Sequence, residues 1–126
     1  MSQVRVLLVD DETDLIEIVE ERLRLRGIEA AVSNSGHDAL ARLRDCEFNV
    51  VVVDVRMPTM GGLELLERIK KICPKTQVIL LTGRGSEEES KMGIARGAFD
   101  YLIKPVNIND LIATLERAVT AGQSMA

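Results

Sequence analysis

Aromatic residues and clustered basic residues are both scarce in this 126-residue sequence. Aromatic side chains make up 2% of the residues and Trp is absent, so a core must be built from aliphatic side chains and Met, which suits parallel strands covered by helices. The 16 Lys and Arg residues are spread along a chain of formal net charge −4. Because nucleic-acid affinity depends on clustered basic side chains, we expect no direct nucleic-acid binding by this chain.

Long apolar runs are also missing. No stretch approaches the roughly 20 apolar residues that a membrane-spanning helix needs. Met1 leads directly into a strand-like run, without the charged and apolar regions of a signal peptide. We therefore expect a cytoplasmic protein that does not associate with a membrane.

Cysteine and histidine are too few and too dispersed for a zinc site. Cys46 and Cys73 form no C-x-x-C pair, and no His–Cys spacing that would hold zinc is present. We expect both cysteines to be reduced structural residues. His37, the only histidine, is expected on the surface at the start of a helix.

Short aliphatic runs alternate with longer amphipathic segments, a pattern typical of repeated βα units. It predicts strands at residues 4–9, 28–33, 49–54, 77–82 and 98–103, and helices at residues 13–26, 37–45, 63–72, 87–96 and 108–120. Because right-handed crossovers leave few other arrangements, we expect an α/β flavodoxin-like (βα)5 open sandwich: a five-stranded parallel sheet of order 2-1-3-4-5 with helices on both faces.

Residues 1–126 are expected to form one domain, with a core over about residues 3–120 and a frayed tail at residues 121–126. Gly27 and Gly97 are expected to end helices in the left-handed conformation, and Ser86 to cap the helix over 87–96. No linker or basic segment follows Thr120. This favours a stand-alone domain, and a domain cut from a longer regulator would look the same.

Polar residues follow the predicted strands where each strand ends. Asp10 and Asp11 end the first strand, Asp54 the third and Thr82 the fourth, and Lys104 follows the fifth. Parallel strands all end at the same edge of a sheet, so these side chains are expected to cluster there. The first and third strands also flank the switch point of the expected strand order, where open α/β sheets bind ligands.

Three carboxylates in close proximity repel one another, and either a proton or a cation must relieve that repulsion. At neutral pH a divalent cation is the better answer. With oxygen ligands and no His or Cys nearby, Mg²⁺ fits best. Lys104 adds a positive charge suited to a phosphate group.

Four motifs in order and at matching spacing resemble the receiver domains of two-component response regulators. They are LLVDDE at residues 7–12, VVVDVRMPTMGG at 51–62, LLTGRG at 80–85 and AFDYLIKP at 98–105. The resemblance covers nearly the whole chain. It implies that Asp54 is the phosphoacceptor, that Asp11, Asp54 and the backbone carbonyl of Arg56 bind Mg²⁺ directly, and that Asp10 binds it through water.

The resemblance also assigns the groups that hold and sense the phosphoryl group. Lys104 would bind a phosphoryl oxygen, and its bond to Pro105 would be cis. Thr82 would form a hydrogen bond to the phosphoryl group, and Tyr101 would turn inward as Thr82 moves. Val106 departs from the family pattern, in which many members carry Phe at this position.

The resemblance implies that the function is Mg²⁺-dependent transfer of a phosphoryl group to Asp54. The donor would be the phosphohistidine of a sensor histidine kinase, or a phosphotransfer protein in a phosphorelay. The domain would catalyse its own phosphorylation and dephosphorylation and would not otherwise be an enzyme. The signal would pass through the face formed by the last two helices and the last strand, which includes Lys91, Arg96, Tyr101 and Glu116. Its recipient would be a downstream effector domain or protein, or a second copy in a phosphorylation-dependent homodimer.

Two other functions use the same fold or chemistry. A pseudo-receiver would bind partners without phosphorylation, although the complete set of polar residues at the strand ends argues against it. A metal-dependent phosphohydrolase with an aspartyl-phosphate intermediate would need a general acid two residues after Asp54, where Arg56 stands. Arg56 is instead expected to tune the lifetime of the phosphoryl group.

Overall fold

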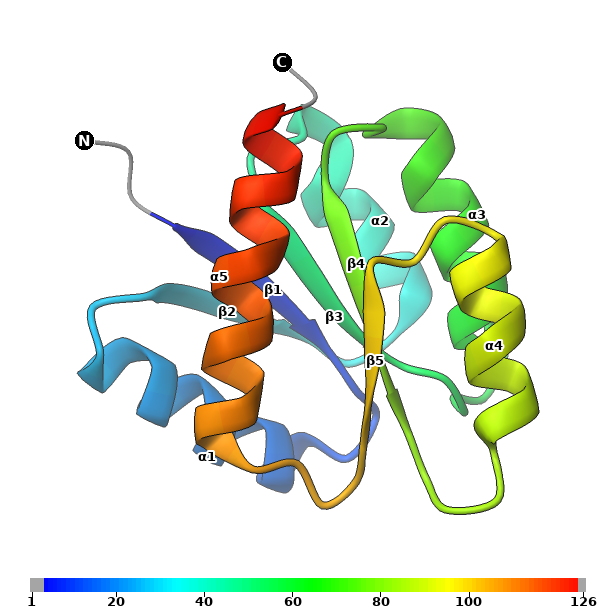
Figure 1. The fold of residues 1–126 in the computed structure, drawn as a ribbon, viewed down its shortest axis with the longest axis horizontal. Coiled ribbons are helices and arrows are strands. Elements are labelled where there is room, and N and C mark those ends of the chain that lie inside the picture. The colour runs from blue at the N-terminus through cyan, green and yellow to red at the C-terminus, as the bar shows by residue number, and fades with distance from the viewer. Residues whose placement is uncertain (1–3, 125–126) are drawn as a thin grey trace.

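Five strands and five helices alternate along the chain in a computed structural model that describes residues 4–124, with side chains as far as Gln123 (Figure 1). The strands are β1 (Arg5–Val9), β2 (Glu29–Ser33), β3 (Val50–Asp54), β4 (Gln77–Thr82) and β5 (Asp100–Ile103). The helices are α1 (Thr13–Leu25), α2 (Gly36–Arg42), α3 (Gly62–Ile72), α4 (Glu87–Ala95) and α5 (Ile108–Ser124), with a short 3-10 helix, η1 (Leu43–Asp45), after α2.

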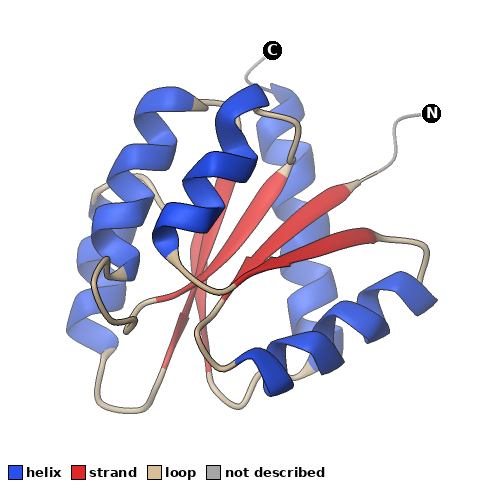
Figure 2. Ribbon diagram, turned by 180° about the vertical axis from the view of Figure 1, so that it is seen from behind, coloured by secondary structure: helices blue, strands red, loops and turns tan. Residues whose placement is uncertain are grey.

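The strands form one parallel sheet of order β2-β1-β3-β4-β5, which confirms the predicted topology. Helices lie on both faces of the sheet (Figures 1 and 2). Alternate residues of β1 and β3 point to opposite faces: one set packs with α2 and α3, and the other packs with α1 and α5. All five residues of β3 are buried, as expected for the central strand of a sheet covered on both sides.

The predicted ends of the helices were confirmed in part. Gly27 and Gly97 have φ values of +78° and +112°, which lie in the region that favours glycine. Ser86 occupies the N-cap position of α4, but its side chain makes no capping hydrogen bond, so that part of the prediction is wrong. Its ψ of 22° departs from the extended backbone that aims a capping side chain at the first turn.

The predicted frayed tail is wrong for residues 121–124, because α5 continues to Ser124. Gly122 lies close to the α3–β4 loop: a Cβ atom added to it would be 3.2 Å from the carbonyl oxygen of Lys75. This packing extends the helix beyond the point that the sequence pattern predicted. Residues 1–3 and 125–126 of the predicted domain lie outside the described residues. β5 begins at Asp100, two residues later than predicted, because the Ala98 amide still bonds to the Gly93 carbonyl of α4.

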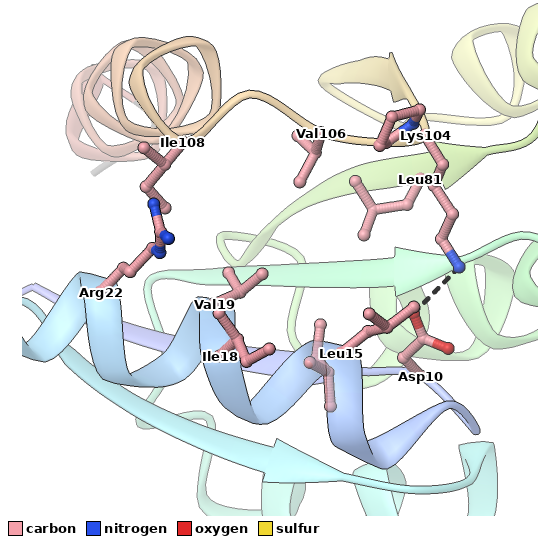
Figure 3. Close-up of a pocket in the computed structure, with 11 residues that line it drawn as sticks. Asp10, Leu15, Ile18, Val19, Arg22, Leu81, Lys104, Val106 and Ile108 are labelled. Carbon is pink, nitrogen blue, oxygen red and sulfur yellow. Dashed lines mark ion pairs between the residues drawn. The ribbon is translucent and has the colours of Figure 1, made fainter.

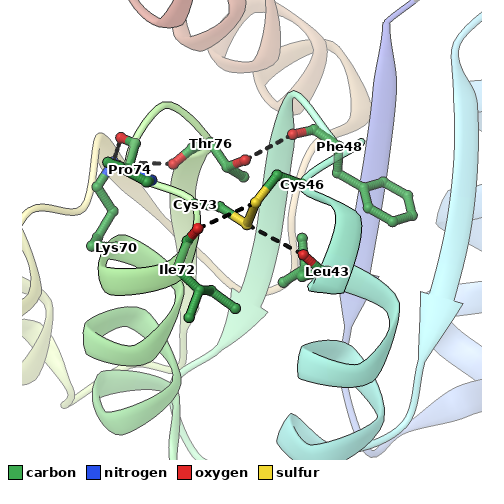
Figure 4. The surroundings of a disulfide bond; sticks show 8 residues. All are labelled: Leu43, Cys46, Phe48, Lys70, Ile72, Cys73, Pro74 and Thr76. Atoms are coloured by element: carbon green, nitrogen blue, oxygen red, sulfur yellow. Dashed lines mark hydrogen bonds between the residues drawn. A yellow bond between two sulfur atoms is a disulfide. The ribbon is translucent and has the colours of Figure 1, made fainter.

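Cys46 and Cys73 form a disulfide, so the prediction of two reduced cysteines is wrong (Figure 4). They are separated by 27 residues, but each precedes one of two neighbouring strands, β3 and β4. Parallel strands begin at the same edge of a sheet, and this topology brings the two cysteines together. None of the helices within residues 4–124 is both long enough and apolar enough to span a membrane.

Candidate functional site

The strand ends bring Asp10, Asp54 and Lys104 together at the C-terminal edge of the sheet. β1 ends at Val9, and Asp10 follows in a loop while its amide still bonds to the Ser33 carbonyl of β2 at 3.1 Å. Val9 pairs with Val53, the residue before Asp54, so the two carboxylates lie on adjacent strands. Asp10 is 3% exposed and Asp54 is 6% exposed, so both carboxylates are removed from bulk water.

The ammonium of Lys104 bridges these two carboxylates. Its Nζ lies 3.0 Å from Oδ2 of Asp10 (Figure 3). It also lies 3.1 Å from Oδ2 of Asp54. Glu12 Oε1 is further away, at 3.6 Å. The predicted clustering of these residues is therefore observed, with one ammonium facing more than one carboxylate.

Burial is the largest influence on the pKa of Asp54 and raises it, and the negative charge of Asp10 raises it further. The hydrogen bond and charge of Lys104 and the amide of Arg56 act in the opposite direction but do not cancel the rise. Burial alone would lower the pKa of Lys104, but its hydrogen bonds and charge interactions with Asp10 and Asp54 outweigh this and raise it. The ammonium of Lys104 therefore stays charged. A second positive charge at the site would lower the pKa of Asp54 and favour its ionised form.

Glu12 is a member of the cluster that the sequence did not identify. Carboxylate oxygens of Asp10, Glu12 and Asp54 all lie within 4.8 Å of one another, an arrangement that could hold a metal ion. The Glu12 amide donates a hydrogen bond to Oδ1 of Asp10 at 3.0 Å, which holds this loop against the site. Asp11, the predicted ligand, is exposed and lies outside this group. The run of three acidic residues after β1 was the available signal.

Arg56 connects the loop after β3 to α4. Its amide donates to Oδ1 of Asp54 at 3.2 Å, and its guanidinium forms an exposed ion pair with Glu89 of α4 at 2.8 Å. The predicted role of its carbonyl as a metal ligand stays a prediction.

Thr82 ends β4, and Tyr101 lies in the neighbouring strand β5. The Thr82 hydroxyl is buried, donates to the Gly83 carbonyl at 3.2 Å and lies 3.4 Å from the Ser86 carbonyl at the start of α4. Tyr101 pairs across the sheet with Leu80, two residues before Thr82, and is half-buried. The predicted cis peptide between Lys104 and Pro105 is confirmed. His37 is exposed in α2, as expected.

An apolar cavity of about 500 Å³ adjoins the carboxylates (Figure 3). It lies between α1 and the chain from Lys104 to Ile108, and Asp10 forms part of its lining. Leu15 and Ile18 of α1 line it and are 58% and 50% exposed. Large apolar side chains are thus accessible beside the charged site. Val106, the residue that departs from the family pattern, also lines this cavity.

Comparison with known proteins gives a consistent result. The family model described as "Response regulator receiver domain" matches residues 6–116. The transcriptional regulatory protein ZraR of Salmonella typhimurium is 38% identical over 118 residues, which are 94% of this chain but 27% of that protein. This chain therefore spans about a quarter of the length of that relative.

Two solved structures are similar over nearly their whole lengths. A response regulator receiver domain protein from Clostridium thermocellum has a TM-score of 0.93 and 31% identity, and the match covers 98% of this chain and 99% of that one. A CheY-like receiver domain protein from Methanospirillum hungatei has a TM-score of 0.92 and 31% identity, with 99% and 100% covered. Together with the family match, these similarities make this chain a response regulator receiver domain of the kind used in two-component signalling.

Proposed function

We propose that this domain accepts a phosphoryl group on Asp54 from the phosphohistidine of a sensor histidine kinase or from a phosphotransfer protein, with Mg²⁺ as cofactor. One observation carries the proposal: the Lys104 ammonium lies within 3.1 Å of two buried carboxylates, at the edge of the sheet where its strands end. A structural ion pair needs one carboxylate for one ammonium. Two carboxylates and a single ammonium leave a site that a cation and a phosphoryl group would complete.

The chemistry requires a nucleophile and a group that stabilises charge. A carboxylate oxygen of Asp54 would form a bond to phosphorus as the P–N bond of the donor breaks, and the leaving imidazole would take up a proton. Lys104, whose pKa is raised by its two carboxylate partners, would stay charged and bind an oxygen of the transferred group. Release of the phosphoryl group to water would reverse the modification.

The donor set fits a hard divalent cation. All the nearby side-chain ligands are carboxylates, and the pKa of Asp54 is raised because its negative charge is buried near that of Asp10. Asp54, the Arg56 carbonyl and Asp11 would bind Mg²⁺ directly and Asp10 would bind it through water, with Glu12 as a second candidate from the same loop. When bound, Mg²⁺ would neutralise charge on the phosphoryl oxygens.

Thr82 provides a connection from the acceptor to α4. Its hydroxyl is now engaged by the carbonyls of Gly83 and Ser86. A phosphoryl group on Asp54 would add acceptor oxygens that compete for this hydroxyl. Movement of Thr82 would release Ser86 at the start of α4 and allow Tyr101 to turn inward. The face formed by α4, β5 and α5, with Lys91, Arg96, Tyr101 and Glu116, would transmit the change.

A donor protein must approach the acceptor across neighbouring surface. Leu15 and Ile18 supply accessible apolar area next to Asp10, which suits a helix that carries the phosphohistidine. ZraR is named a transcriptional regulatory protein, and this chain matches only part of it. We infer that residues 1–126 act as one domain. Its phosphorylation would be sensed by an effector domain or protein, or by a second copy of this domain.

The test is Mg²⁺-dependent phosphorylation by acetyl phosphate, followed by intact mass. The parent protein is expected to gain one phosphoryl group only when Mg²⁺ is present, and Asp54→Asn to gain none. Asp45→Asn, which changes an exposed carboxylate in η1, is the matched control and should behave like the parent. Equal labelling of Asp54→Asn and parent would disprove the proposal. No labelling of the parent would favour the pseudo-receiver alternative.

A further inference from the structure

The N-terminal edge of the sheet carries the Cys46–Cys73 disulfide, which phosphotransfer does not use (Figure 4). Cys46 follows η1 and leads towards β3, and Cys73 follows α3 and leads towards β4. β3 and β4 are the strands that end at Asp54 and Thr82. The disulfide and the acceptor therefore lie at opposite ends of the same two strands.

The two cysteines differ in accessibility. Cys46 is exposed, whereas Cys73 is 2% exposed and belongs to the core cluster. A disulfide opens when a thiolate reaches one of its sulfur atoms. A thiol from solution can therefore approach Cys46, and Cys73 is the sulfur that leaves.

Hydrogen bonds join the two loops independently of the disulfide. The Thr76 hydroxyl donates to the Phe48 carbonyl at 2.9 Å in a buried contact, and the Gln77 amide donates to the Asn49 carbonyl at 3.0 Å. The Lys70 ammonium donates to the Thr76 carbonyl at 3.0 Å. Because the bonds from Thr76 and Gln77 cross between the two loops, opening the disulfide would leave the two sulfur atoms near each other.

Acceptors for the reduced thiols are also in place. Sγ of Cys46 lies 3.2 Å from the carbonyl oxygen of Ile72, and Sγ of Cys73 lies 3.3 Å from that of Leu43. In the reduced protein each S–H group could donate to its carbonyl, so the buried Cys73 thiol would not be left without a partner. The oxidised and the reduced pair are both compatible with this fold.

We propose that Cys46 and Cys73 form a reversible thiol–disulfide exchange site whose partner is a dithiol reductant. One thiolate of the dithiol attacks Sγ of Cys46, the S–S bond breaks, and Sγ of Cys73 leaves with the electron pair and takes a proton from water. The second thiolate of the dithiol then attacks the reductant's sulfur atom in the mixed disulfide, and Cys46 leaves as a thiolate. Two electrons pass to the protein disulfide, and the dithiol becomes a disulfide.

The geometry favours a dithiol over a monothiol. The Cα atoms of Cys46 and Cys73 are 5.5 Å apart, so the released Cys73 sulfur stays beside the mixed disulfide and can expel a monothiol. A second thiol in the reductant competes with that reversal. The exchange is therefore expected to reach the reduced state readily with a dithiol and poorly with a monothiol.

The site also adjoins the last turns of α5. A cavity of about 220 Å³ is lined by Cys46 and Thr76 on one side and by Val119 and Gly122 of α5 on the other. Reduction removes the covalent link between the loops that face this helix. Faster amide hydrogen exchange is expected at residues 43–48 and 73–76 of the reduced protein, with no change around Lys104.

The first test reduces the oxidised parent protein with dithiothreitol under native conditions and measures free thiols by maleimide mass labelling. The rate of opening is expected to rise in proportion to dithiothreitol and to be unaffected by urea too dilute to unfold the protein. A rate that saturates with dithiothreitol and follows urea-induced unfolding would overturn the proposal, because opening would then require global unfolding.

The second test compares Cys73→Ser and Cys46→Ser, each treated with oxidised glutathione. Cys73→Ser is expected to form the mixed disulfide at Cys46 at least about tenfold faster than Cys46→Ser forms it at Cys73, because accessibility controls thiol reactivity. Equal rates in two folded variants would contradict the asymmetry. If either variant fails to fold by circular dichroism, the experiment on the parent decides. Acetyl phosphate labelling of the oxidised and of the reduced protein tests Asp54 separately. Failure of the disulfide proposal can therefore be distinguished from failure of the proposed phosphorylation.

Discussion

The two edges of the sheet differ in how their polar and reactive groups are satisfied. At the C-terminal edge, one ammonium faces Asp10 and Asp54 in a buried setting, and the pKa of Asp54 is raised. At the N-terminal edge, a covalent bond and buried hydrogen bonds such as that from Thr76 to the Phe48 carbonyl close the structure. The comparison teaches that the edge proposed to bind a cation and a phosphoryl group keeps uncompensated charge, whereas the opposite edge pairs its sulfur atoms and backbone groups with one another.

Loss of the disulfide should give the largest effect. A crosslink that closes a loop of this length stabilises a protein by about 3–4 kcal/mol in the chain-entropy description. The double variant Cys46→Ser/Cys73→Ala is expected to lose about that free energy of unfolding in urea titrations. Reduction of the parent provides the matched comparison. An unchanged urea midpoint would show that the hydrogen bonds alone hold this edge, which would weaken the contrast between the edges.

Substitution of Lys104 tests the opposite edge. Lys104→Met removes the ammonium that bridges Asp10 and Asp54, so we expect the rate of labelling by acetyl phosphate to fall by about 100-fold, a typical effect of removing one charge-stabilising group. Lys75→Met, which alters an exposed lysine between α3 and β4 at the other edge of the sheet, is the control. A rate for Lys104→Met close to that of the parent would remove Lys104 from the acceptor chemistry.

Two acidic residues of the loop after β1 can be distinguished by Mg²⁺ affinity. We expect Asp11→Asn to weaken Mg²⁺ binding at least about tenfold, as loss of a direct ligand does, and Glu12→Gln to weaken it less. The Glu12 side chain is 59% exposed and lies 3.6 Å from Lys104, so it has an alternative partner. Calorimetric titration measures both. The reverse order would make Glu12 the ligand and Asp11 a surface residue.

The smallest effect concerns pH and Lys70 at the N-terminal edge. Burial lowers the pKa of Lys70 below 10.5, so its charged form destabilises the folded state. This penalty is complete below the folded-state pKa and disappears as pH rises from there towards 10.5. The unfolding midpoint of the parent should therefore rise relative to that of Lys70→Met as pH is raised from neutral towards 10.5. The exposed neighbour Lys71→Met is the control, and a falling difference would contradict the assignment.

The sequence predicted the fold because β1, β3 and β4 are nearly continuous aliphatic runs, and because short crossovers restrict the order of parallel strands. It predicted the association of Asp10, Asp54 and Lys104 for the same reason, since strand ends share an edge. These conclusions depend on backbone topology, which periodicity encodes directly.

The missed features depend on tertiary contacts that periodicity does not encode. Cys46 and Cys73 pair because their strands are neighbours, although 27 residues separate them. Glu12 joins the cluster, and its amide bonds to Asp10, whereas Asp11 is exposed and lies outside the group although it is adjacent in sequence. The last turns of α5 form because Gly122 fits closely against the loop at Lys75. A strand order is a property of the chain pattern, whereas these contacts depend on the orientation of single side chains.

The burial of β3 has a mechanical consequence. Every residue of this strand is enclosed, and it is paired on one side with β1 and on the other with β4. A group attached to its last residue is therefore fixed to a fully buried strand within a close-packed interior. If Asp54 is phosphorylated as proposed, displacement would be taken up by the surrounding loops and by α4, and Asp54 would serve as a stationary reference point against which the outer surface is repositioned.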